Sequence, residues 1–216
     1  MRKLITYLLI VATAFTLPLS TTATNVLFPL AAISSLCSEN LREKWLHIKQ
    51  NPISVIMIAF FLLYLIGITY SIGPAHTILH QMTKAVCFLC AALLIPALTS
   101  ARWRQYTINA FLLGMIITLV LSYVKFFFVH DLFHSRFDTS SVFKDHIIQN
   151  FLMAFATFIF AYRWIHKHRY RWAYGVLTLA ATYNVFFMSM GRTGYFIFSA
   201  LLIFTFAYYL RWKGLL

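Results

Sequence analysis

Apolar segments separated by short polar connections dominate the sequence, and they constrain the fold more than any other feature. Hydrophobic residues make up 61% of the chain and charged residues only 11%, so a water-soluble fold could not hide this much apolar surface. Apolar stretches of about 20 residues cross a bilayer as helices. The sequence therefore predicts an all-α polytopic membrane protein, a single transmembrane domain over residues 1–216. About eight helices are expected, at residues 4–19, 24–37, 53–70, 85–99, 106–129, 147–162, 173–190 and 195–210.

The first two segments form one long apolar region that is interrupted by Pro18, by Pro29 and by the threonine-rich residues 20–24. We expect a tight helical hairpin here, because these residues disfavour one continuous helix. The basic start and the small residues also resemble a secretory signal. We expect the first helix to be retained, because a second apolar run follows it directly.

The basic residues predict the orientation. With the N-terminus in the cytoplasm, most of the 18 lysines and arginines fall in cytoplasmic segments, as the positive-inside rule requires. Both termini are then cytoplasmic. The net charge of +13 is explained by this topology, and the basic residues 162–172 are interpreted as an anchor to anionic lipid, with no role in nucleic-acid binding. The opposite face receives Lys84, Lys125, Arg136, Lys144 and Arg192. We find no obvious partner for Lys125 in the sequence.

The longest outer connection, residues 130–150, is rich in histidine and aspartate. His130 and His134 are four residues apart, which would put both imidazoles on one helical face, and Asp131 and Asp138 could add oxygen ligands. Spacing fixes no third ligand for a zinc ion, so we prefer a segment that rests in the headgroup layer. No metal and no cofactor are predicted.

Three cysteines, Cys37, Cys87 and Cys90, lie in or beside apolar segments. The last two have the spacing of a redox pair, but no acid or histidine is near in sequence to activate a thiol. We expect Cys87 and Cys90 to pack against a neighbouring helix. His76 and His80 are interpreted as interfacial polar residues.

The stretch FKDHIIQN opens the sixth segment from the outer side. Asp145 suits the first turn of a helix, where its charge complements the helix dipole. Lys144 could hold an anion. His146 could donate to a pyrophosphate or act as a base, although one histidine does not make a catalytic site.

The stretch MSMGRTGYFIF places Arg192 between Gly191 and Gly194 at the outer end of the seventh segment. The two glycines would permit a sharp reversal and a close approach of the backbone to another surface. Arginine is well suited to bidentate phosphate binding. The alternative is an arginine that snorkels to a lipid phosphate.

The interrupted first hairpin, FKDHIIQN at an outer helix start and SMGRTGYFIF at the next outer turn together resemble the amino-terminal half of bacterial O-antigen ligases and the related O-antigen polymerases. The resemblance implies an inner-membrane glycosyltransferase of lipopolysaccharide biosynthesis that works at the periplasmic face. Its substrates would be a polyprenyl pyrophosphate-linked glycan and the lipid A core. Arg192, with Gly191, Gly194, Lys144 and His146, would bind the donor pyrophosphate and stabilise its charge as the glycosidic bond breaks.

The chain departs from this family in one respect. The family's catalytic histidine lies in a large periplasmic loop nearer the carboxyl terminus, and no histidine here matches it by motif. We therefore expect no ligase activity from the isolated polypeptide. It could be a truncated product, one half of a split protein whose companion chain carries the missing half, or a divergent relative that has lost the chemistry. The alternatives are a non-catalytic membrane scaffold in envelope assembly and a small transporter.

Overall fold

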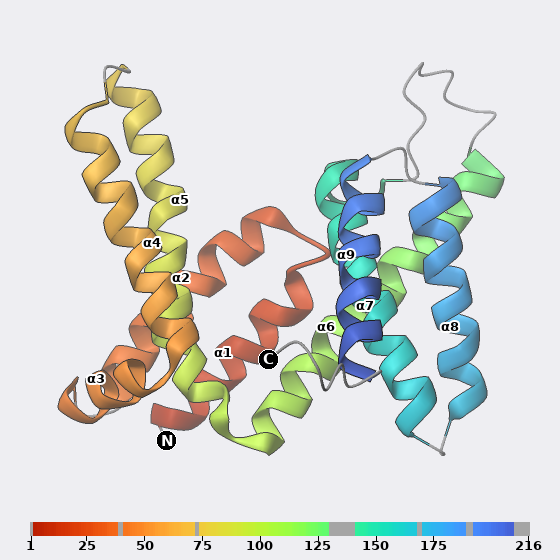
Figure 1. Ribbon diagram of the computed structural model, residues 1–216, viewed down its shortest axis with the longest axis horizontal. Helices are drawn as coiled ribbons and strands as arrows, with labels where there is room; N and C mark the ends of the chain where they lie inside the picture. Colours follow the sequence, from red (N-terminus) through yellow and green to blue (C-terminus); the bar gives the residue numbers. More distant parts are fainter. Residues whose placement is uncertain are drawn as a thin grey trace. The chain divides into compact units, whose positions relative to one another are not determined.

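The computed structural model describes residues 2–38, 41–71, 74–129, 141–167, 170–188 and 192–209. The regular elements in these ranges are all helices, so the predicted all-α class is confirmed for the described part. In chain order they are α1 (Arg2–Thr16), α2 (Thr21–Ser38), α3 (Leu41–Gln50), α4 (Pro52–Thr69), α5 (Ala75–Leu94), η1 (Ile95–Thr99), α6 (Ala101–Val124), η2 (Lys125–Val129), α7 (His146–His166), α8 (Arg171–Tyr183), η3 (Asn184–Met188) and α9 (Arg192–Tyr209) (Figure 1).

Each predicted apolar segment corresponds to a helix, and the sequence analysis missed only the short helix α3 among the described elements. The apolar stretches long enough to cross a membrane, within the described residues, are Pro52–Thr69, Gln81–Thr99 and Ala101–Phe128. A helical membrane protein is thus supported. The eight crossings and the cytoplasmic termini stay predictions.

The helices gather into two compact units. Unit 1 comprises Met1–Leu17 and Thr21–Phe111, and unit 2 comprises Pro18–Ser20 and Leu112–Leu216. Unit 1 thus holds α1 to α5 with the first part of α6, and unit 2 holds the rest of α6 with α7 to α9. Compactness alone does not define a domain, so the single domain stays a prediction.

The predicted hairpin of unit 1 is confirmed, because α1 ends at Thr16 and α2 begins at Thr21. Pro29 lies inside α2 and does not end it. Small residues let α1, α2 and α5 approach closely around a buried cluster of Ile10, Ala31, Ala32, Cys90 and Leu94.

The cysteines of the Cys-x-x-Cys pair differ in burial. The expectation that they pack against another helix is confirmed for Cys90, which lies in the buried cluster of unit 1, and is wrong for Cys87, which is exposed. Position in the helix explains the difference, because residues three apart need not share the buried stripe when that stripe is narrow.

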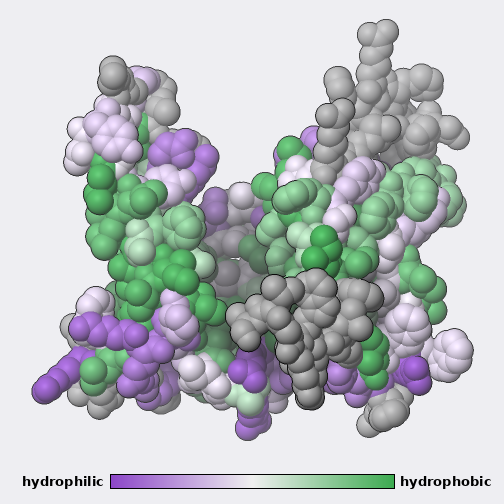
Figure 2. Space-filling view, in the orientation of Figure 1, coloured by the Kyte–Doolittle hydropathy of each residue, from purple (hydrophilic) through white to green (hydrophobic). Residues whose placement is uncertain are grey.

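The second hairpin of unit 1, formed by α4 and α5, presents apolar side chains outward. Asn51 caps α4, because its side-chain oxygen accepts a hydrogen bond from the backbone N–H of Ile53 at 3.0 Å. Pro52 occupies the first turn, where the backbone N–H that proline lacks would have no acceptor within the helix. Figure 2 shows hydrophobic side chains over most of this hairpin. Such a surface is suited to lipid.

The interior of unit 2 contains many polar side chains. Gln149, Asn150 and Thr157 on α7 are buried together with Met153 and Phe160. The π-helical segments η2 and η3 continue α6 and α8. π-Helical turns inside helices often occur at functional sites.

Candidate functional site

Two side chains fix the segment that leads into α7. Lys125 in η2 donates from Nζ to the carbonyl oxygen of Ser141 at 2.8 Å. The backbone N–H of Val142 donates to Oε1 of Gln149 at 2.9 Å. The segment is therefore tied both to η2 and to the first turn of α7, and Lys125 has a partner that the sequence did not reveal.

The residues next to these anchors begin α7. Asp145 is the N-cap residue, as predicted from the helix dipole, but its side chain makes no capping hydrogen bond. Instead Oδ1 of Asp145 lies 2.8 Å from Nδ1 of His146, which orients the imidazole ring. Lys144 is half-buried, and burial lowers its pKa because desolvation disfavours the charged ammonium.

The start of α9 packs against α7 at one tight contact. A Cβ added to Gly194 would lie 2.1 Å from Nδ2 and 2.3 Å from Cγ of Asn150, so no other residue fits there without movement. Asn150 is fully buried on α7. The close approach of the backbone that we predicted for Gly194 is confirmed, and the surface it approaches is the Asn150 side chain.

The position of Gly194 in the chain differs from the prediction. The helix α9 begins at Arg192, so Gly194 lies inside the first helical turn and takes no part in a reversal. No described glycine has a positive φ. Gly191 and the Arg192 side chain lie outside the described part of the structure, whereas the Arg192 backbone is placed two residues before the contact with Asn150.

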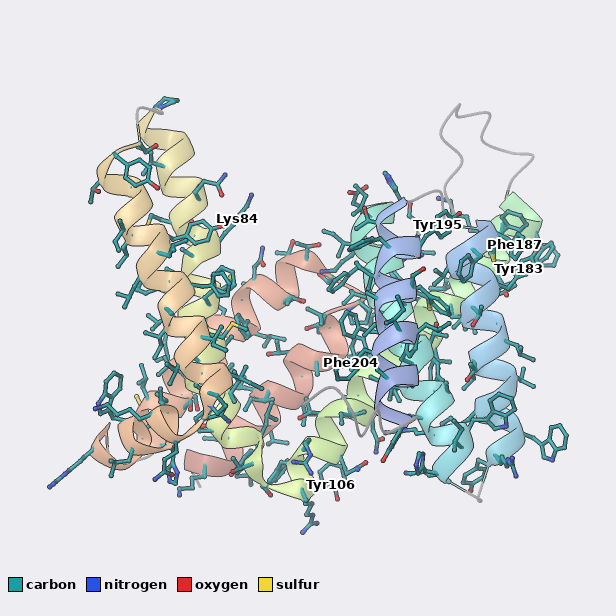
Figure 3. All side chains as sticks on the ribbon, viewed as in Figure 1. Lys84, Tyr106, Tyr183, Phe187, Tyr195 and Phe204 are labelled. Carbon is teal, nitrogen blue, oxygen red and sulfur yellow. The ribbon has the colours of Figure 1, made fainter. Side chains whose placement is uncertain are left out.

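A second contact ties α9 to η3. The Tyr195 hydroxyl donates to the carbonyl oxygen of Phe186 at 2.9 Å, and the two rings stack at 5.4 Å. Figure 3 shows Tyr195 at this end of α9, and Tyr183 and Phe187 at the corresponding end of α8. The π-helical η3 disturbs the regular helical bonding, and the tyrosine satisfies one of its carbonyl groups.

The segment η3 is in turn held by a buried polar contact with α6. Asn184 donates from Nδ2 to Oγ of Ser122 at 2.8 Å, and both side chains are fully buried. Buried hydrogen bonds of this kind fix one arrangement of two helices, because a shift would leave polar atoms without partners.

These contacts bring several of the predicted site residues together. His146 lies one helical turn, about 5.4 Å, before Asn150, and Arg192 lies two residues before Gly194, which touches Asn150. The starts of α7 and α9 are therefore neighbours. Helix starts carry partial positive charge and unpaired N–H groups, so two adjacent starts with Lys144 nearby favour an anion.

Sequence reasoning missed the residues that assemble this end of unit 2, which are Ser122, Gln149, Asn150, Asn184 and Tyr195. A signal existed for Asn150. It lies four residues after His146 and hence on the same helical face, within an otherwise apolar helix. The partner helix of such a polar residue cannot be read from one sequence.

The other candidate residues contribute nothing to this site. His130, Asp131, His134 and Asp138 lie outside the described residues, as do the side chains of His76 and His80. Among the described residues no group of three or more histidines, cysteines and acids is placed to hold a metal ion.

Comparisons of the chain with protein-family models, with curated protein sequences and with solved structures found no match.

Proposed function

We propose that the chain is an O-antigen ligase-like protein of a bacterial inner membrane that binds a polyprenyl pyrophosphate-linked glycan at the paired starts of α7 and α9. The observation that carries the proposal is the contact between Gly194 and Asn150, which joins two motifs that are 44 residues apart in the sequence. Without this contact, nothing would place Arg192 and the Lys144–His146 segment close enough together to bind one ligand.

The chemistry of the site suits a diphosphate group. A pyrophosphate carries several negative charges, and helix starts, a lysine and an arginine all favour such charge. Asp145 holds Nδ1 of His146, which leaves Nε2 as the ring atom that reaches a phosphate oxygen. Exposed aromatic side chains on the neighbouring helix ends, Phe127, Phe128 and Phe187, suit the level of a membrane interface.

The residues of this chain have two roles in the proposed reaction. They hold the diphosphate, and they stabilise the negative charge that it gains when the bond to the sugar breaks. Transfer to the lipid A core also needs a base, and no residue of this chain is assigned that role. Donor binding is therefore the activity that the chain itself is proposed to have, with the site facing the periplasm.

The test is donor binding by variants of Arg192. The full chain in detergent is titrated with farnesyl pyrophosphate and with farnesyl monophosphate. Arg192→Ala should weaken pyrophosphate binding by about tenfold or more, because a charge-assisted hydrogen bond contributes about 1.5–3 kcal/mol. Arg192→Lys should also weaken binding, because lysine lacks the bidentate fork.

Arg171→Ala provides the control, since Arg171 is exposed at the start of α8, in the basic segment 162–172, and lies outside the proposed pyrophosphate site. An equal loss in the Arg171 and Arg192 variants would indicate general charge attraction and would refute the proposed site. Equal binding of the mono- and pyrophosphates by the wild-type chain would also contradict it.

A membrane scaffold is the second candidate, and the exposed α4–α5 hairpin favours it. Exposed apolar side chains cover α4 and include Val86 on α5, which suits a partner helix as well as lipid. A scaffold should keep its partners when Arg192 is replaced. The donor titration therefore separates the two functions.

A further inference from the structure

The short helix α3 leads directly into the apolar stretch of α4. It ends at Gln50, and the stretch that is long enough to cross a membrane begins at Pro52. Two residues reach at most about 7 Å, so the end of α3 lies close to the end of this stretch. Figure 1 shows α3 at an angle to α4, beside the end where α4 begins. The helix α3 is therefore expected at the boundary between hydrocarbon and water.

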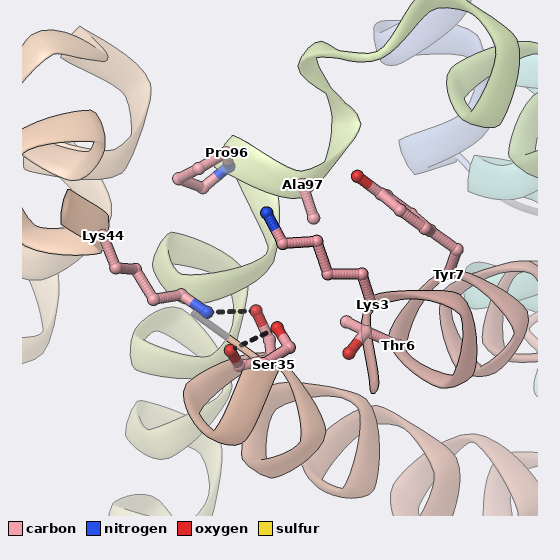
Figure 4. A pocket seen from close by; sticks show the side chains of 8 residues that line it. Lys3, Thr6, Tyr7, Ser35, Lys44, Pro96 and Ala97 are labelled. Atoms are coloured by element: carbon pink, nitrogen blue, oxygen red, sulfur yellow. Dashed lines mark hydrogen bonds between the residues drawn. The ribbon is translucent and has the colours of Figure 1, made fainter. Parts of the chain in front are cut away.

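One side of α3 packs against the rest of unit 1. Lys44 is only 3% exposed, and Ile48, four residues later on the same side, is 4% exposed. The Lys44 ammonium group donates to Oγ of Ser35 on α2 (Figure 4). This hydroxyl group donates in turn to the carbonyl oxygen of Leu93 on α5 at 3.3 Å. These contacts determine which side of α3 faces the protein, and hence which side faces outward.

The outward side of α3 carries a stripe of apolar and basic residues. Its members are spaced at i, i+3, i+4 and i+7, which puts them on one helical face, and they are Arg42, Trp45, Leu46 and Lys49. All four are exposed, and Trp45 and Leu46 each expose about half of their surface. The Lys49 ammonium group lies 5.4 Å from the centre of the Trp45 ring. We call these four residues the α3 stripe. The side chain of Glu43 lies outside the described part.

The chemistry of the α3 stripe matches a lipid surface with anionic headgroups. Two large apolar side chains that stay exposed to water lose the favourable free energy of burial, and tryptophan is favoured at the boundary of a bilayer. Helices that lie in the membrane plane combine such residues with lysine and arginine, which bind headgroup phosphates. Figure 2 shows hydrophilic side chains at this end of unit 1, next to the hydrophobic surface of the α4–α5 hairpin.

We propose that α3 lies in the plane of the membrane with the α3 stripe against the headgroup layer, and that anionic phospholipid strengthens this docking. The proposal does not depend on the pyrophosphate site of unit 2. An acidic protein partner could use the same two charges, but without that partner the stripe would face water. Contact of the stripe with lipid in a bilayer that holds only this chain therefore separates the two occupants.

The test places a fluorescent label at Leu46→Cys in the full chain, with the exposed cysteines Cys37 and Cys87 replaced by alanine. The buried Cys90 is kept, and a chain with only the two alanine replacements gives the background. The chain is reconstituted into nanodiscs of phosphatidylcholine, with or without phosphatidylglycerol. Doxyl lipids report contact with lipid, and a water-soluble nitroxide reports contact with water. His47→Cys is the matched control, because His47 is exposed and lies about 100° further round the helix.

We expect doxyl lipids to quench the label at position 46 by at least about twofold more than the label at position 47, and the water-soluble nitroxide to do the reverse. Phosphatidylglycerol should increase the quenching by lipid at position 46. Equal quenching by lipid at the two positions would overturn the docking of α3 on lipid. So would a label at position 46 that only the water-soluble nitroxide reaches. No change on adding phosphatidylglycerol would overturn the preference for anionic lipid.

The charges of the α3 stripe are tested by Arg42→Gln combined with Lys49→Gln. This variant should lower the ratio of docked to undocked α3 in phosphatidylglycerol by about tenfold or more, because each basic residue at an anionic surface contributes a factor of about five. Arg102→Gln combined with Arg104→Gln is the control, since it removes two exposed charges at the start of α6. It should leave the ratio unchanged. An equal fall in both double variants would refute the assignment to the α3 stripe.

Discussion

The α4–α5 hairpin of unit 1 and the α6–α9 helices of unit 2 use their polar residues in opposite ways. The buried share is 6% in the apolar span of α4 and 22% in the span Gln81–Thr99, which includes most of α5, whereas it is 33% in the span Ala101–Phe128, most of which belongs to unit 2. Buried asparagine, glutamine, serine and threonine side chains bond across or along the helices of unit 2. The hairpin instead turns Leu63 and Ile66 outward.

The difference shows where a site can be built in an apolar chain. Interhelical polar contacts hold neighbouring helices in one arrangement, and the two helix starts of unit 2 meet because such contacts position them. An exposed apolar surface such as that of α4 provides no such constraint. The contrast predicts that similar substitutions in the two regions have different effects.

The largest difference is expected between two glycines. Gly194→Ala should lower the free energy of unfolding by about 1–3 kcal/mol, because its Cβ would overlap Asn150. It should also weaken pyrophosphate binding, since the start of α9 moves. Gly67→Ala on α4 is the matched control, because within the described part of the chain its Cβ would meet only the Tyr70 hydroxyl, at 3.7 Å.

Gly67→Ala should be neutral or stabilise the fold by up to about 1 kcal/mol, the helix propensity difference between the two residues. Thermal unfolding in detergent gives both values. Adding Asn150→Ala to Gly194→Ala should restore part of the lost stability, because the overlap is removed. Equal effects at the two glycines would refute the close α7–α9 contact.

The second prediction concerns the pH dependence at Lys144. Its pKa is lowered by burial, so the ammonium group loses its proton below the usual value of about 10.4. Pyrophosphate affinity should therefore fall as the pH rises through this lowered pKa. The fall should come at higher pH in Lys144→Arg, because arginine stays charged.

Stability should change in the opposite direction. Between the lowered pKa of Lys144 and its ordinary value, the unfolded chain binds more protons at this site, so the contribution of Lys144 to unfolding free energy rises with pH. General unfolding would lower the pyrophosphate affinity and the stability together. A fall in affinity while the contribution of Lys144 to stability rises would instead indicate the loss of a ligand contact. Identical pH profiles for the wild type and Lys144→Arg would exclude Lys144 from the site.

The smallest effect is expected between two buried serines. Ser122→Ala should cost about 1–2 kcal/mol of unfolding free energy, because it removes the acceptor for Asn184. The Ser54 hydroxyl on α4 is buried and has no hydrogen-bond partner within the described residues. Ser54→Ala should therefore be neutral or slightly stabilising. Chemical denaturation of both variants measures the two changes in the free energy of unfolding. A larger loss of stability in Ser54→Ala than in Ser122→Ala would contradict the prediction.

The sequence predicted the helices well and their contacts poorly, for physical reasons. The spacing of apolar residues and the length of each apolar segment are local features that define a helix. The break of the hairpin before Thr21 and the start of α7 beside Asp145 could therefore be located from the sequence. The short helix α3 was missed because it has only ten residues and carries several charged side chains of its own. Its hydrophobic signal is weaker than that of a span.

The candidate site was predicted only in part. Lys144 and His146 follow from a helix start that carries charge, which is a local pattern. The meeting of Gly194 with Asn150 depends on which helices pack together, and a single sequence carries no direct signal for such a pair. The role of Gly194 was therefore predicted as an approach to an unidentified surface, and its place in a turn was wrong.

The most direct test of the central claim is thiol labelling beside Arg192. Thr193→Cys, made in a chain whose Cys37, Cys87 and Cys90 are replaced by alanine, is treated in spheroplasts with a membrane-impermeant maleimide. The account predicts labelling from outside, and slower labelling when farnesyl pyrophosphate is added than with the monophosphate. Labelling only in inside-out vesicles, or at a rate that pyrophosphate leaves unchanged, would contradict it.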